Sequence, residues 1–310
     1  MPIVSSIVPG DSSPVHSTIP RAGFASNVRL DCGGHAVAGL GKQRRQGVGI
    51  NVTRRGGTVT DCHVTGFAEG SYAGEVSRLD IRHSSANGNG EGFRIGATVG
   101  ATLTDNTAIG NDSWGFVVQW TKKSKLVGNV ANDNSIGFFM ADAPRNVVKR
   151  NSAKGNRDFN YAVHGASSRN TLVRNVSTDG GRGFDIEGDR NEFRANRVTG
   201  SRGHGIALSK HADRNVLTAN TVTGGTANGF NVRGVGNTLA GNTATDNNAV
   251  GIEDRTVPGT NSYTDNTCIN NAAGASSPAG LCDDTVPVEP EPATQASDNA
   301  DPEGEVTSEE

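Results

Sequence analysis

The sequence is poor in apolar and aromatic residues for its length. Hydrophobic residues make up 34% of the 310 positions and aromatic residues 5%, less than an ordinary globular core uses. No segment approaches the roughly 18 consecutive apolar residues of a transmembrane helix, so such a span is excluded. The net charge of −3 and the recurring short apolar clusters argue against a chain that is disordered throughout. Glycine, with 42 residues, and asparagine, with 30, are abundant instead, and both are typical of turns.

Charge is unevenly distributed along the chain. Residues 283–310 carry ten acidic residues and no lysine or arginine, which leaves residues 1–282 with 29 basic and 22 acidic residues and a charge of +7. The segment is also rich in Pro, Ser and Thr, so it cannot bury enough apolar surface to offset its ordering entropy. We expect a disordered acidic tail that adds solubility, with masking of a basic groove as the alternative.

Cysteine is scarce, and its four positions fall into two pairs. Cys32 and Cys62 lie in neighbouring segments of the same kind, and Cys268 and Cys282 bracket the end of the repetitive region. This placement predicts two local disulfides and hence an oxidising compartment. The absence of a CxxC pair disfavours a zinc or redox site. The first residues do not have the form of a secretory signal, yet the cysteines favour an extracellular or cell-surface location.

Asparagine recurs at a nearly constant interval through most of the chain. The first series, spaced by 21–24 residues, is Asn106, Asn129, Asn151, Asn175, Asn196, Asn220, Asn242 and Asn266. A second series runs five residues ahead of it and is Asn146, Asn170, Asn191, Asn215, Asn237 and Asn261. Between the two, a glycine precedes alternating apolar residues, as in Gly92-Phe93-Arg94-Ile95. Alternation over four or five residues predicts a short strand with one buried face.

Each repeat holds about three such strands separated by turns, and no stretch long enough for a helix. A unit of this kind closes one coil, and stacked coils bring equivalent residues about 4.8 Å apart. Asparagine at a fixed turn then forms a ladder of amide hydrogen bonds, while glycine supplies the left-handed backbone that corners require. A leucine-rich repeat is disfavoured because its periodic leucine frame is missing.

These Asn series and Gly–apolar strands resemble the right-handed parallel β-helix of the pectate-lyase-like superfamily. Residues 30–35, 47–50 and 57–60 resemble the opening coils of that family. The resemblance implies an all-β solenoid of roughly nine to ten coils over residues 27–282. Because an open solenoid end exposes strand edges, we expect residues 1–26 to cap one end and a coil closed by Cys268 and Cys282 to cap the other.

Outward-facing residues of the Gly–apolar strands form columns along the solenoid, and charged residues gather in one stretch of them. Asp185 and Glu187 lie two apart on one strand, with Cα atoms about 6.5 Å apart on the same side. His164 lies beside Glu187 from the preceding coil, and Arg233 lies two coils beyond. The predicted catalytic residues are Asp185, Glu187, His164, His204 and Arg233. The predicted substrate-binding residues are Lys210, Gln119, Phe139 and Trp120.

Two carboxylates this close can divide the roles of general acid and general base if their environments separate their pKa values. In the polyuronate lyases and C5-epimerases of the superfamily, a cation neutralises the substrate carboxylate and a base removes the C5 proton. That resemblance assigns Arg233 or Lys210 to the first role and His164 or His204 to the second. The charge of +7 on the body suits a polyanionic substrate.

A shorter resemblance indicates hydrolysis. Gly203-His204-Gly205 is similar to the Gly-His-Gly motif of polygalacturonase-type glycoside hydrolases, and Thr178-Asp179-Gly180 is loosely similar to their Asn-Thr-Asp-Gly strand. This resemblance implies that Asp185 or Asp179 is the acid/base group and that His204 supports it. The Asp-Asp pair and the Arg-x-Lys motif of that family are missing here.

The sequence therefore predicts an enzyme that acts on an acidic, uronate-containing polysaccharide by hydrolysis, β-elimination or epimerisation. The alternatives are a glycan-binding or surface scaffold without catalysis and a small-molecule lyase or isomerase on the same solenoid. No cofactor is evident; calcium is possible if Asp185, Glu187 and Asp189 cluster, and no other metal is expected. Nucleic acid is not an expected partner, because the body is only mildly basic and aromatic residues do not alternate with arginine. The oligomeric state is left open.

Overall fold

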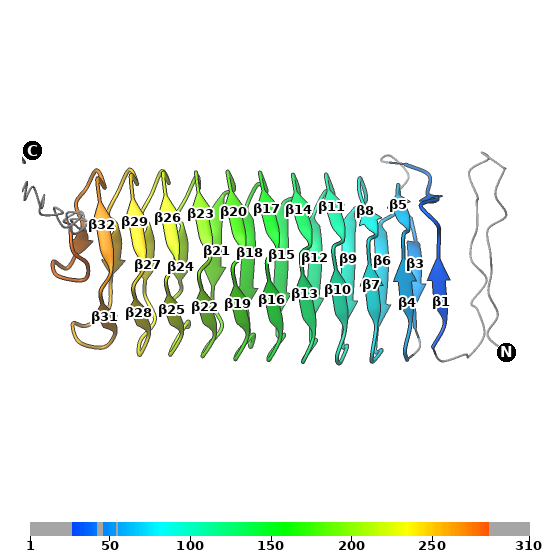
Figure 1. Ribbon diagram of the computed structural model, residues 1–310, viewed down its shortest axis with the longest axis horizontal. Coiled ribbons are helices and arrows are strands. Elements are labelled where there is room, and N and C mark those ends of the chain that lie inside the picture. The colour runs from blue at the N-terminus through cyan, green and yellow to red at the C-terminus, as the bar shows by residue number, and fades with distance from the viewer. Residues whose placement is uncertain (1–26, 42–45, 54, 285–310) are drawn as a thin grey trace, which may run out of the picture.

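The computed structural model describes residues 27–41, 46–53 and 55–284, which form a parallel β-helix (Figure 1). Three strands make one coil, and each pairs in parallel with the equivalent strands of neighbouring coils, so that three 11-stranded sheets run along the solenoid. Ten full turns separate the first and last strands of each sheet, which confirms the predicted fold and its roughly nine to ten coils. The described residues contain no helix, and therefore none that could cross a membrane. The expected cap at 1–26 and all but the first two residues of the expected tail at 283–310 lie outside the described residues, and Asp283 pairs with Thr267 in the last coil.

We name the sheets A, B and C in the order in which the chain visits them. Sheet A consists of β1 (Arg29–Asp31), β4 (Thr58–Thr60), β7 (Asp80–Arg82), β10 (Thr102–Thr104), β13 (Lys125–Val127), β16 (Val147–Lys149), β19 (Thr171–Val173), β22 (Glu192–Arg194), β25 (Val216–Thr218), β28 (Thr238–Ala240) and β31 (Ser262–Thr264). Sheet B consists of β2 (Ala36–Ala38), β5 (His63–Thr65), β8 (Ser85–Ala86), β11 (Thr107–Ile109), β14 (Val130–Asn132), β17 (Ser152–Lys154), β20 (Val176–Thr178), β23 (Arg197–Thr199), β26 (Thr221–Thr223), β29 (Thr243–Thr245) and β32 (Thr267–Ile269). Sheet C consists of β3 (Val48–Val52), β6 (Glu69–Gly74), β9 (Glu91–Gly96), β12 (Trp114–Gln119), β15 (Ile136–Ala141), β18 (Phe159–His164), β21 (Arg182–Ile186), β24 (Ile206–Leu208), β27 (Phe230–Val232), β30 (Ile252–Asp254) and β33 (Ser276–Ser277).

The two predicted Asn series line two corners of the solenoid. The first series lies between sheets A and B, where each Nδ2 donates to the Oδ1 of the next asparagine at 3.0–3.1 Å. The same group also donates to a backbone carbonyl, as Asn129 does to Leu103 at 2.9 Å. In the second series, between sheets C and A, Oδ1 accepts a backbone N–H of the preceding coil, as Asn191 does from Asn170 at 2.8 Å. The ladders thereby satisfy backbone groups that the turns would leave unpaired.

A third Asn series lines the corner between sheets B and C and was not predicted. It comprises Asn89, Asn111, Asn134 and Asn156, and it resumes at Asn247 and Asn271. After Asn156 the equivalent position is Gly180, because the Asn160 side chain takes that place: it accepts from Asn156 at 2.7 Å and donates to Ser177 at 2.8 Å. A Cβ on Gly180 would lie 2.5 Å from the Asn160 amide nitrogen. Asn160 thus continues the ladder from within a strand.

Stacked aromatic rings from sheet C fill the centre of the solenoid. Phe93, Phe116, Phe138, Tyr161 and Phe184 have centroids 4.5–5.1 Å apart and nearly parallel planes. The strand glycines beside these rings are required by the close approach of coils, because a Cβ on Gly183 would lie 2.4 Å from the carbonyl oxygen of Gly205. Their backbones are not left-handed, unlike those of many corner glycines.

Both predicted disulfides are formed, one near each end of the described solenoid. Cys32 and Cys62 join the first coil to the second, and Cys268 and Cys282 close the last. Together with the ladders and the ring stack, they hold the coils in one register. That register decides which outward side chains meet on sheet C.

Candidate functional site

The outer face of sheet C carries three parallel columns of side chains. The residue after each stacked ring points outward, and parallel pairing aligns these residues from coil to coil. The first column is Arg94, Val117, Phe139, Ala162, Asp185, Ala207, Asn231 and Glu253, as the alternation predicts. A second column, two residues further along each strand, contains Gln119, Ala141 and His164. A third, before the strand glycines, contains Trp114, Ile136, Phe159 and Arg182.

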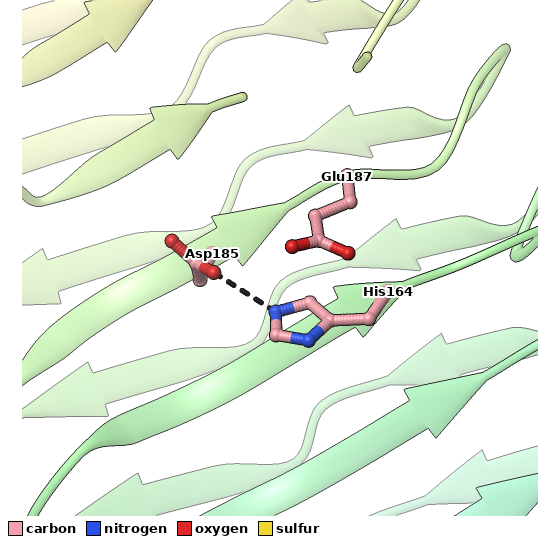
Figure 2. Close-up of side chains that lie close together, drawn as sticks. All are labelled: His164, Asp185 and Glu187. Atoms are coloured by element: carbon pink, nitrogen blue, oxygen red, sulfur yellow. Dashed lines mark hydrogen bonds and ion pairs between the residues drawn. The ribbon is translucent and has the colours of Figure 1, made fainter. Parts of the chain in front are cut away.

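Asp185 is the centre of a hydrogen-bonded group on this face (Figure 2). The Nε2–H of His164, from the end of β18, donates to Asp185 Oδ2 at 2.8 Å. Arg182, three residues earlier on β21, donates from Nη1 to Oδ1 at 2.6 Å. Burial alone would raise the pKa of Asp185, but these two donors hold it below the usual value, with the side chain only 13% exposed. Asp185 is therefore a fixed carboxylate at neutral pH, and in the tautomer that donates to it from Nε2, His164 has Nδ1 as its acceptor.

Glu187 follows β21 and directs its carboxylate toward the same group (Figure 2). One oxygen each of Glu187 and Asp185 and one ring nitrogen of His164 all lie within 4.8 Å of one another. These three atoms could hold a cation. However, Asp185 already accepts hydrogen bonds on both of its oxygens, and Arg182 supplies a positive charge there.

Aromatic rings from its own strand and from the preceding coil border His164. Phe139 and Phe159 meet its ring edge to face, with centroids 5.6 and 5.8 Å away. Trp114 stacks on Phe139 at 5.6 Å with an interplanar angle of 12°. Arg182 lies over Phe159, with its Cζ 5.8 Å from the centroid. The apolar surface expected at Phe139 is therefore present, and it extends to two rings that the sequence reasoning missed.

His204 stands just before β24, in line with Arg182 of the preceding coil. Burial lowers the pKa of His204, and the nearby positive charges of Arg182, Arg233 and Arg255 lower it further, while Glu253 opposes them. Its imidazole is consequently neutral at neutral pH. Its Nδ1 is buried and has no hydrogen-bond partner among the described residues.

Arg233 and Lys210, the two predicted cationic residues, lie further from the Asp185–His164 pair than Arg182 does. Arg233 is two coils beyond Glu187, which is about 10 Å along the solenoid. It would therefore contact a different part of an extended ligand than His164 does. Lys210 lies in the exposed turn that follows β24. Arg182 is the cation next to the pair.

The two remaining predicted binding residues differ in position. Gln119 lies at the end of β12 and accepts a hydrogen bond from Arg94 at 3.0 Å. Trp120 begins the following turn with a φ of 50° and is 61% exposed. The structure therefore brings Trp114, and not Trp120, onto the ring of Phe139.

Two further carboxylates lie away from the Asp185 group: Asp179, expected from the resemblance to polygalacturonase-type hydrolases, and Asp189, expected for a calcium site. Asp179 lies at the corner after β20, with a φ of 51°. Asp189 lies at the corner between sheets C and A, where it accepts the backbone N–H of Asp213 at 3.0 Å. His164, and not Asp189, is the third member beside Asp185 and Glu187.

An open hollow of about 360 Å³ lies elsewhere, at the corner between sheets B and C. Its lining includes Asn111, Asp133, Ser135 and Arg157. Ser135 accepts a hydrogen bond from Arg157 at 3.0 Å. The hollow shares no lining residue with the Asp185 group, so it does not provide an enclosed pocket for it.

Comparisons with known proteins agree with this architecture. The profile of the family described as "Periplasmic copper-binding protein (NosD)" matches residues 40–179 and 160–280. None of the curated proteins matches the chain. Solved structures of the same fold include the periplasmic alginate epimerase AlgG, at 14% identity and a TM-score of 0.57, with 82% of this chain and 72% of that chain covered.

Two further similar structures come from other kinds of protein. The Dettilon tailspike protein is 16% identical with a TM-score of 0.61, and the match covers 82% of this chain and 60% of that one. The catalytic domain of a GH87 alpha-1,3-glucanase, in complex with nigerose, is 13% identical with a TM-score of 0.54, and the match covers 84% and 61%. At these identities the likenesses establish the fold alone.

Proposed function

This chain belongs to the family described as periplasmic copper-binding protein (NosD), and we propose that in this member the outer face of sheet C binds a polysaccharide and acts on it at Asp185 and His164. One observation carries the proposal. A carboxylate–imidazole pair lies beside a row of aromatic rings on an open face that runs the length of the solenoid. Aromatic rings bind the apolar faces of sugars, and an open, elongated face suits a polymer.

The side chains in the described part of the chain do not fit the copper named in the family description. Protein copper sites draw on cysteine, methionine and several histidines. Among the described residues all four cysteines form disulfides, and Met140 is buried in the core. The group around Asp185 offers one imidazole and is already neutralised by Arg182. Copper therefore takes no part in the proposed reaction.

The pair is arranged for removal of a proton next to a carboxyl group. Asp185 fixes His164 with Nδ1 free, as a carboxylate orients the base in other proton-transfer sites. A uronate sugar placed over the pair would lose its C5 proton to Nδ1, and the C–H electron pair would move into the carboxyl group to give an enolate. Arg182 is the cation placed to stabilise that charge.

Two outcomes follow from such an enolate. Protonation of C5 from the opposite face by water, with release of the abstracted proton from His164 to the resulting hydroxide, gives the epimer. Cleavage of the C4–O bond, with departure of the alkoxide and its protonation, gives the unsaturated product. Hydrolysis is less well supported, because it requires a protonated general acid and the pKa of Asp185 is held low by His164 and Arg182.

A non-catalytic glycan-binding scaffold is the second candidate. It is favoured by the commitment of both Asp185 oxygens to hydrogen bonds within the protein. Such a protein would bind glycans on the same aromatic surface without turnover. Binding and turnover must therefore be measured separately.

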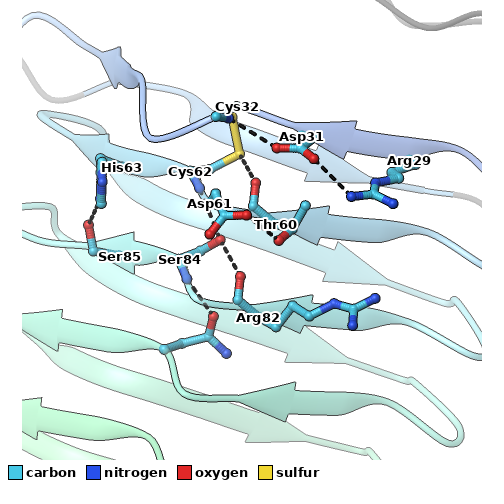
Figure 3. The surroundings of a disulfide bond; sticks show 12 residues. Arg29, Asp31, Cys32, Thr60, Asp61, Cys62, His63, Arg82, Ser84 and Ser85 are labelled. Carbon is cyan, nitrogen blue, oxygen red and sulfur yellow. Dashed lines mark hydrogen bonds and ion pairs between the residues drawn. A yellow bond between two sulfur atoms is a disulfide. The ribbon is translucent and has the colours of Figure 1, made fainter.

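The two disulfides support a location outside the cytosol. Cys32 and Cys62 lie in a well-connected region: Cys62 Sγ is 3.3 Å from the Thr60 carbonyl, and its backbone N–H donates to Ser84 (Figure 3). Disulfides of this structural kind persist in oxidising compartments. We place the protein in the periplasm or outside the cell, where polysaccharides are encountered.

The test follows exchange at C5 in heavy water. Uronate and neutral polysaccharides are incubated with the protein, and NMR detects deuterium incorporation while ultraviolet absorbance detects unsaturated ends and a reducing-sugar assay detects hydrolysis. His164→Gln is expected to lower C5 exchange by about 10²–10⁴-fold. His83→Gln, an exposed histidine away from sheet C, is the matched control.

Binding is measured on the same variants by calorimetry. Trp114→Ala is expected to weaken binding, while His164→Gln retains it. Binding without exchange on any uronate polymer would favour the scaffold. If reducing ends form without deuterium exchange at C5, the reaction is hydrolysis and not proton abstraction.

A further inference from the structure

A second preorganised carboxylate lies on the same face, three coils beyond Asp185. Glu253 of β30 occupies the same column as Asp185, with Ala207 and Asn231 between them. Asn228 and Asn231 donate from Nδ2 to Glu253 Oε2 at 2.5 and 2.8 Å. Arg255 Nε forms an ion pair with the same oxygen at 2.9 Å. Within the described part of the chain, Oε1 has no donor.

The two asparagines beneath Glu253 are buried, and only Asn228 also bonds the backbone, where its Oδ1 accepts the N–H of Val250 at 3.2 Å. Asn228 is 6% exposed and Asn231 is 2% exposed. At the position of Asn231, other coils carry Val117, Ala162 or Ala207 and form the same strand. Burying an amide is unfavourable unless it is hydrogen-bonded, and here both amides bond Glu253. Both amide nitrogens therefore hold that carboxylate in one orientation.

Neighbouring groups add donors and an acceptor around Glu253. His204 lies one coil before Asn228 in the same line, and the charges of Arg182, Glu253, Arg233 and Arg255 all act on it. Its buried Nδ1 has no partner among the described residues. Arg233 is exposed on the coil between His204 and Glu253. A fixed carboxylate near an exposed guanidinium and an imidazole nitrogen without a partner suits the neighbouring hydroxyl groups of a sugar ring.

We propose that Glu253, with His204 and Arg233, forms a second sugar-binding subsite that recognises vicinal hydroxyls of a hexopyranose unit. The inference rests on the proposed function, because it assumes that a glycan lies along sheet C. Three coils separate Asp185 from Glu253, which is about 14 Å along the axis. Each unit of an extended hexose chain adds a length similar to the spacing between two coils of the solenoid. A glycan must therefore contain about four units to reach both groups.

This spacing makes the prediction specific to ligand length. Loss of a charge-assisted hydrogen bond weakens binding by about tenfold. Glu253→Gln is expected to produce that loss for oligosaccharides of about four units or more, and to leave the affinity of dimers and trimers bound at the aromatic rings unchanged. The amide keeps the shape of the carboxylate and can still accept from Asn228 and Asn231.

The experiment is calorimetric titration of uronate oligosaccharides from two to about eight units. Wild type is compared with Glu253→Gln, with Arg233→Gln at the exposed edge of the same subsite, and with Glu192→Gln on sheet A as the control. Thermal melting of each variant shows whether it is folded. A length threshold in both subsite variants, absent from the control, supports the proposal. An equal loss at every length, or no loss at any length, overturns it.

Failure of this inference is separable from failure of the proposed function. If His164→Gln leaves C5 exchange intact while Glu253→Gln still shows the length threshold, the assigned chemistry is wrong and the subsite stands. If His164→Gln abolishes exchange but Glu253→Gln binds all lengths as wild type does, only the subsite is wrong.

Discussion

Replacement of a single asparagine in the middle of the first ladder should strongly destabilise the protein. Asn129 is buried at the corner between sheets A and B. Its Oδ1 accepts from the backbone N–H and from the Nδ2 of Asn106, both at 3.0 Å. Its Nδ2 donates to the Leu103 carbonyl at 2.9 Å and to Asn151 Oδ1 at 3.0 Å. Asn129→Ala removes all four hydrogen bonds.

The size of the expected destabilisation follows from the two backbone groups that lose their hydrogen-bond partners. The Leu103 carbonyl loses the Asn129 donor, and the Asn106 N–H loses its acceptor, both in a buried corner. A buried polar group without a partner costs about 1–3 kcal/mol, so the two together cost about 4 kcal/mol. A typical domain is stable by only about 5–15 kcal/mol. The variant should therefore lose a large part of its folding free energy.

Equilibrium unfolding in urea, followed by far-ultraviolet circular dichroism, measures this loss. Asn248→Ala is the matched control, because Asn248 is exposed and its side chain belongs to no ladder; its free energy of unfolding should change by less than about 0.5 kcal/mol. A change below about 1 kcal/mol for Asn129→Ala would refute the reasoning. It would mean that the ladder does not satisfy the corner backbone in solution.

Three further perturbations test other parts of the structure. Asp185 has a lowered pKa, so its contribution to stability is complete above about pH 4 and is lost as the pH falls through its folded-state pKa. Asp185→Asn should therefore show a shallower fall of the free energy of unfolding in acid than the wild type. Parallel curves for the two proteins would contradict this. Replacing both Cys268 and Cys282 by Ser opens a loop of sequence separation 14 and should lower the free energy of unfolding by about 3 kcal/mol in urea titrations, whereas an unchanged midpoint would exclude a role for this closure. Gly183→Ala would place a Cβ 2.4 Å from the Gly205 carbonyl oxygen and should reduce stability by about 1–3 kcal/mol, while Gly96→Ala, with nothing within 4 Å, should not; equal melting temperatures for the two would show that the coils can move apart.

The fold could be predicted because the same chemical requirement recurs in every coil. An amide at a fixed corner and a glycine at a fixed strand position leave a periodic trace in the sequence, as Asn129 and Gly183 show. The third Asn series escaped because it is interrupted at Gly180, where Asn160 supplies the amide from a different position. A contact that changes its sequence position between coils leaves no simple period.

The site was predicted less completely than the fold. The outward column containing Asp185 follows from strand alternation, and His164 was placed on the neighbouring coil. Trp114, Phe159 and Arg182 were missed because strict alternation counted back from the buried ring places each of them inside. In the structure the residue before the ring and the ring residue itself are both buried, so the alternation breaks there and the preceding residue lies on the outer face.

Side-chain direction is the part that alternation cannot supply. His164 was expected beside Glu187, but its ring turns to donate to Asp185. Arg182 reaches forward along its own strand to the other Asp185 oxygen. Such choices depend on rotamers and on competition between partners, which a pattern of residue types does not encode.

The strict register of the coils turns the solenoid into a molecular ruler. One whole repeat inserted between β21 and β30 would separate Asp185 from Glu253 by about 4.8 Å more without altering either group, and a deletion would shorten the distance by the same step. The interval between two points on sheet C therefore changes only in whole units. Duplication or loss of a repeat gives this architecture a route to new ligand lengths that requires no point mutation at either end.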